Sequence, residues 1–115
     1  KNIINLPLIK TFSINDSNKW EESIKLIIKR DYYINNPPIL LEISNQKNKE
    51  DKFSNLIKLF KDYKFEIAQK IVDDFENNEV ILIIRSDNIT HKMLEEFNEN
   101  SNYLNCKFSG WILLK

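Results

Sequence analysis

Apolar residues recur at three- and four-residue steps in three stretches of the chain, which is the spacing of one face of an α-helix. The first stretch has a cap at Asp16 or Ser17 and must end before Pro37–Pro38, because proline lacks an amide donor. The third stretch can begin at Asn88 or Thr90. The three predicted apolar faces consist of Trp20, Ile24, Ile27 and Ile28; of Phe53, Leu56, Ile57, Phe60 and Tyr63; and of Ile89, Met93, Leu94, Phe97 and Leu104.

Strands are predicted where apolar residues alternate with polar ones or form short runs. Even-numbered apolar positions suggest a first strand within residues 6–14. Ile39–Ile43 is short, β-branched and nearly all apolar, which is typical of a central strand with both faces covered. A strand that begins at Phe65 and ends by Val72 is followed by Val80–Ile84. The polar residues between them predict an antiparallel hairpin, with its connection formed by Asp73, Asp74, Asn77 and Asn78.

The last strand, residues 106–114, contains a Gly-Trp pair. Strict alternation assigns two sets of residues to opposite faces. These are Cys106, Phe108, Gly110, Ile112 and Leu114 on one face, and Lys107, Ser109, Trp111 and Leu113 on the other. A glycine within a strand indicates a bulge, a bend or a close backbone approach. Trp111 is expected either to anchor the N-terminal helix on the sheet near Trp20 or to contact a partner.

From residue 39 the predicted order is strand, helix, strand, strand, helix, strand. Right-handed crossovers fold this order into a ferredoxin-like βαββαβ sheet, which is antiparallel and carries both helices on one face. The predicted class is therefore α+β, with an extra N-terminal helix and a further strand before it. A chain of 115 residues is expected to form one domain over residues 17–115, with residues 1–16 as an N-terminal extension or edge strand.

Composition narrows the range of functions. Seventeen basic residues balance seventeen acidic ones, so generic nucleic-acid binding is disfavoured. RNA binding on the sheet is also disfavoured, since the predicted middle strands carry aliphatic and not aromatic residues. The chain contains neither a long apolar run nor a secretory signal pattern, so we expect a soluble, cytoplasmic protein without membrane contact.

Candidate catalytic residues are few, and we expect no enzyme, cofactor or metal. A single glycine excludes the Gly-rich loops that cradle phosphates. His91 is the only histidine and is expected to be an ordinary surface residue. Cys106 is expected to be buried, which raises the pKa of a thiol and makes it inert. Asp73 and Asp74 suit a turn better than a metal site.

Two short segments resemble a known family. Residues 102–111, which contain Phe108-Ser109-Gly110-Trp111, are similar to the closing signature of the regulator of ribonuclease E activity B family, where a helix runs into Tyr-Asp-Gly-Trp. Phe108 and Ser109 stand in place of the tyrosine and the aspartate. Residues 59–67 resemble the helix end that leads into a Gly-Tyr-Glu-Val strand in that family, although the glycine is absent here. The similarity spans about residues 17–113.

The resemblance implies a ferredoxin-like domain that regulates an RNA-degrading enzyme by binding protein, with no catalytic residues of its own. An immunity-type protein that neutralises a toxin by tight binding is the alternative, because it too needs only a compact domain without catalytic groups. Either function requires a protein partner. The candidate partner-binding residues are Trp111, Ser109, Glu95, Glu96 and Glu99. The glutamates could bind a cation or a basic partner, or could form a solvated helix face.

Overall fold

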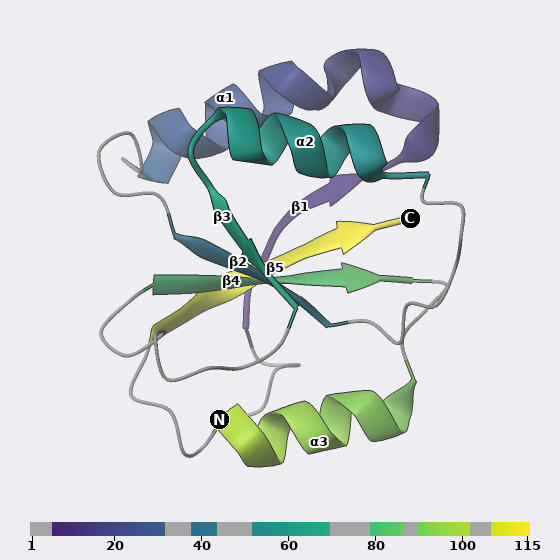
Figure 1. Cartoon of the computed structure of the whole chain (residues 1–115), viewed down its shortest axis with the longest axis vertical. Coiled ribbons are helices and arrows are strands. Elements are labelled where there is room, and N and C mark those ends of the chain that lie inside the picture. Colours follow the sequence, from purple (N-terminus) through teal and green to yellow (C-terminus); the bar gives the residue numbers. More distant parts are fainter. Residues whose placement is uncertain (1–5, 32–37, 44–51, 70–78, 87–89, 102–106) are drawn as a thin grey trace.

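The computed structural model describes residues 6–31, 38–43, 52–69, 79–86, 90–101 and 107–115. Within these residues α1 and α2 lie on one side of a sheet and α3 lies on the other (Figure 1). The elements in chain order are β1 (Leu8–Phe12), the 3₁₀ helix η2 (Ile14–Lys19), α1 (Trp20–Asp31), β2 (Ile39–Ile43), α2 (Ser54–Asp62), β3 (Glu66–Ala68), β4 (Glu79–Arg85), α3 (His91–Ser101) and β5 (Lys107–Leu114).

The sheet of the described residues has the strand order β1-β5-β4-β2-β3, and every neighbouring pair is parallel. The fold is therefore α/β, with helices on both faces of a parallel sheet. The predicted α+β class was wrong, and so was the antiparallel ferredoxin-like arrangement with both helices on one face. The fold that the family resemblance implied is corrected with it.

The error arose between β3 and β4. β3 pairs with β2, and β4 pairs with the other side of β2, so the two do not form the predicted hairpin. The polar residues from Asp73 to Asn78 suggested a turn, but they lie outside the described residues. The better signal was β4 itself, where Val80–Arg85 is buried throughout. A near-continuous apolar strand is typical of a parallel sheet that is covered on both faces.

Alternation along the strands sends side chains into a separate core on each face. On the α1/α2 face the core includes Phe12, Trp20, Ile24, Phe60 and Ile112. On the α3 face it includes Leu41, Leu82 and Phe97. The helix predictions are confirmed: the predicted apolar faces of α1 and α2 pack toward the sheet, as do Leu94 and Phe97 of α3, whereas Met93 belongs to neither core. Ile89 and Leu104, which the third stripe also included, lie outside the described residues.

The turn from α2 into β3 has a residue in the left-handed backbone region. Lys64 has a φ of 73°. The amide of Phe65 donates to the carbonyl of Phe60 at 3.1 Å, and the amide of Lys64 donates to the carbonyl of Lys61 at 3.0 Å. These two bonds define a Schellman motif, and the Phe60 and Phe65 rings complete it in edge contact at 5.3 Å. Glycine is the residue that usually takes the Lys64 position, and its absence was noted from the sequence.

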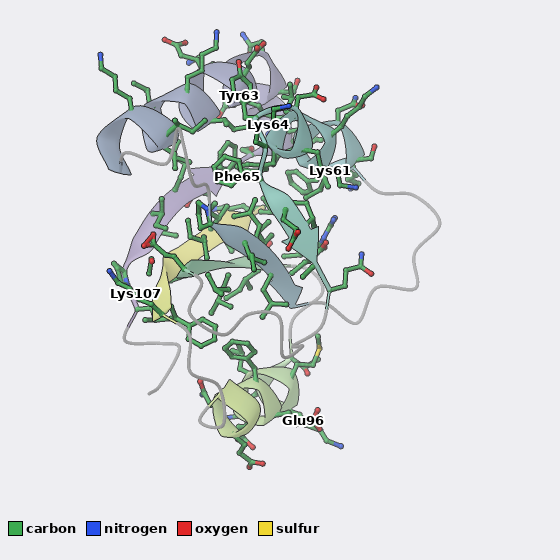
Figure 2. The ribbon with its side chains drawn as sticks, turned by 60° about the vertical axis from the view of Figure 1, so that its left-hand side comes forward. Lys61, Tyr63, Lys64, Phe65, Glu96 and Lys107 are labelled. Atoms are coloured by element: carbon green, nitrogen blue, oxygen red, sulfur yellow. The ribbon has the colours of Figure 1, made fainter. Side chains whose placement is uncertain are left out.

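Beside this turn, a tyrosine joins the two helices of the α1/α2 face. The Tyr63 hydroxyl donates to Glu21 Oε2 at 2.7 Å, which links the end of α2 to the start of α1. This hydrogen bond to Glu21 is the largest cause that raises the pKa of Tyr63 above its ordinary value of 10.0. Tyr63 and Lys64 lie within the α1/α2 layer, above the sheet in Figure 2, and Tyr63 packs against the core of this face.

Candidate binding surface

A bulge in β5 changes which residues share a face. Val80 pairs with Phe108 and Ile81 pairs with Gly110, so Ser109 is an extra residue on β5. Strict alternation therefore fails at this point. Phe108 and Trp111, predicted on opposite faces, both pack against the α3-face core. The bulge that Gly110 suggested is present, but its effect on the two aromatic residues was not anticipated.

Gly110 allows β1 to approach β5 closely. A Cβ atom at this position would lie 2.6 Å from the carbonyl oxygen of Pro7 and 2.9 Å from Cγ1 of Ile9. The next amide, that of Trp111, donates to the same Pro7 carbonyl at 3.0 Å. The absence of a side chain at Gly110 thus makes room for the start of β1. Ile9 occupies this space and packs against the α1/α2-face core.

Trp111 lies on the opposite side of the sheet from Trp20. Trp20 belongs to the α1/α2-face core and donates its indole N–H to the carbonyl of Ser13 at 2.9 Å. Trp111 is half-buried, packs against the α3-face core, and donates its indole N–H to the carbonyl of Leu6 at 3.0 Å. The expectation that Trp111 anchors the N-terminal helix near Trp20 was wrong. Trp111 instead holds the segment that leads into β1.

Apolar side chains that are not fully buried surround Trp111. Leu8 is its cross-strand partner on β1 and is 49% exposed, while Leu6 and Leu113 are half-buried against the same core. Paired residues of neighbouring strands share a face, so Leu8 lies on the α3 side. We call these four residues, Leu6, Leu8, Trp111 and Leu113, the β1–β5 patch. In this patch of described residues, the half-buried ring of Trp111 lies beside the exposed side chain of Leu8.

Ser109 lies next to this patch in sequence. Its hydroxyl oxygen is buried and makes no hydrogen bond. A polar atom in this state costs free energy, and the bulge that re-aims the strand accounts for its position. Ser109 therefore belongs to the β1–β5 junction.

The three candidate glutamates form a separate group on α3. Glu95, Glu96 and Glu99 are all exposed, and Glu96 points outward from the helix in Figure 2. Glu95 accepts from His91 Nε2 at 2.9 Å across one helical turn. No contact between these glutamates and Trp111 is found within the described part of the chain. Trp111 and Ser109 therefore form one candidate region, and the acidic residues of α3 form another.

Of the candidate catalytic residues, only His91 lies among the described residues. His91 is exposed at the first position of α3, as predicted for a surface residue. Cys106, Asp73 and Asp74 lie outside the described residues. Within residues 6–31, 38–43, 52–69, 79–86, 90–101 and 107–115, no group of three or more histidine, cysteine or carboxylate side chains is placed to hold a metal.

A buried ion pair joins β2 and β4 and was not predicted from the sequence. Arg85, at the end of β4, donates from Nε to Glu42 Oε2 on β2, and both side chains are buried. The Arg85 guanidinium also lies 5.8 Å from the centre of the Phe53 ring. The pair lies where the chain leaves β2 and β4 for helices on opposite faces. The feature of the sequence that could have indicated this ion pair is a charged residue at the end of each of two apolar runs.

No protein-family model, curated protein or solved structure matches this chain. Among the described helices, none combines the length and the apolar character that crossing a bilayer requires.

Proposed function

We propose that this domain is a noncatalytic regulator that binds another protein through the β1–β5 patch. The observation that carries the proposal is the half-buried Trp111 paired with Leu8, whose side chain is 49% exposed. Tryptophan is enriched among the residues that dominate protein–protein affinity. Apolar side chains that are exposed together on one face mark a surface that a partner protein can cover.

The partner should present an apolar segment that lies along β1 and β5 on the α3 side of the sheet. The indole N–H of Trp111 already donates to Leu6. Contact with a partner would therefore come mainly from the indole ring and from Leu8, with no new hydrogen bond from the indole. Ser109 would act by shaping the strand that carries Trp111. Glu95, Glu96 and Glu99 would contribute by steering a basic partner toward the domain.

Two partner classes follow from the sequence. The resemblance of residues 59–67 and 102–111 to the ribonuclease regulators favours an RNA-degrading enzyme, although the parallel sheet removes the shared fold as a reason for that choice. A toxin is the alternative class. In either class, the domain would act by occluding its partner. The two partner classes differ in the activity that the domain suppresses.

The test compares two exposed leucines. Leu8 lies in the β1–β5 patch and is 49% exposed, whereas Leu26 lies on α1 and is 59% exposed. We expect a partner captured by the wild-type domain from its native lysate to be lost with Leu8→Glu and retained with Leu26→Glu. Thermal unfolding of both variants checks that the fold is kept.

Once the partner is purified, its affinity for each variant should follow the same order, with a loss of at least about tenfold for Leu8→Glu, because burying an unpaired carboxylate at an interface is costly. The domain should then suppress RNA hydrolysis if the partner is a ribonuclease, or toxicity if it is a toxin. Equal affinity of Leu8→Glu and Leu26→Glu for the partner would remove the patch from the proposal.

A further inference from the structure

We draw no further inference here: the strongest candidate, the carboxyl edge of the sheet between β2 and β4, carries none because Glu42 and Arg85 already bind each other there and the neighbouring residues 44–51 and 87–89 lie outside the described part of the chain.

Discussion

The two faces of β5 differ in how completely they are covered. Ile112 and Leu114, which point toward α1 and α2, are each 1% exposed. Trp111 and Leu113, which point toward α3, are half-buried. The same strand thus contributes to a sealed core on one face and to a partly open apolar surface on the other.

This difference suggests a division of roles between the two layers. On the α1/α2 face, β1, α1 and α2 bring aromatic rings together, and Phe12 and Phe60 meet edge to face at 5.6 Å. Dense packing of this kind stabilises the fold. On the α3 face, α3 packs Phe97 against Phe108 at 5.5 Å and leaves Leu8 exposed. The binding proposed above uses the residues at that margin.

The largest expected effect concerns the ion pair at the end of the sealed face. Glu42→Leu should lower the free energy of unfolding by about 3–5 kcal/mol, because it removes the buried carboxylate that binds the Arg85 guanidinium. Chemical denaturation measures the change. The exposed carboxylate of Glu95 provides the contrast, and Glu95→Ala should change stability by less than about 0.5 kcal/mol.

A double variant separates charge from packing at this pair. Glu42→Leu combined with Arg85→Met should recover most of the lost stability, since a buried ion pair can be replaced by apolar residues of similar volume. If the double variant is as unstable as Glu42→Leu alone, the loss comes from altered packing and the assignment of the pair is wrong.

The next effect concerns the junction between β1 and β5. Gly110→Ala should lower the free energy of unfolding by about 1–3 kcal/mol, because the added methyl group would meet the Pro7 carbonyl and the Ile9 side chain. Ser109→Ala is the matched control. It should leave stability unchanged or raise it slightly, since the Ser109 hydroxyl is buried without a hydrogen bond. Equal denaturation midpoints for Gly110→Ala and wild type would contradict the close approach.

The smallest of these effects is a gain at the turn from α2 into β3. Lys64→Gly should raise the free energy of unfolding by about 0.5–1 kcal/mol, because glycine avoids the cost of the left-handed conformation. Lys58→Gly, in the middle of α2, should lower it by roughly 1 kcal/mol. A loss of stability at both positions would show that Lys64 does not adopt a positive φ.

Helices and buried stripes could be predicted from the sequence because each depends on local spacing. Trp20, Ile24 and Ile27 pack as their spacing indicated. Strand direction does not follow from alternation, which is identical in parallel and antiparallel strands, and the signal for a parallel sheet was instead the near-continuous apolar run of β4. Two features needed three-dimensional information. One is the placement of β3 and β4 on opposite sides of β2, and the other is the bulge at Ser109, which turns Trp111 toward α3.

The candidate site was predicted in part. Trp111 was singled out with its neighbour Gly110, as either a core anchor or a partner contact, and it packs half-buried against the α3-face core. Leu8 was missed, since its role depends on the pairing of β1 with β5 across most of the chain length. The Glu42–Arg85 pair was missed for the same reason. Each apolar run ends in a charged residue, but nothing local in the sequence shows that these two residues of distant strands meet.

The two tryptophans allow the contrast between the faces to be measured directly. Trp20→Phe leaves Trp111 as the fluorophore of the α3 face, and Trp111→Phe leaves Trp20, which is 4% exposed on the other face. Acrylamide quenching of each variant, alone and with the purified partner, is the most direct test. We expect Trp111 to be quenched more strongly than Trp20, and the partner to protect Trp111 alone. Unchanged quenching of Trp111 in the complex would contradict binding through the β1–β5 patch.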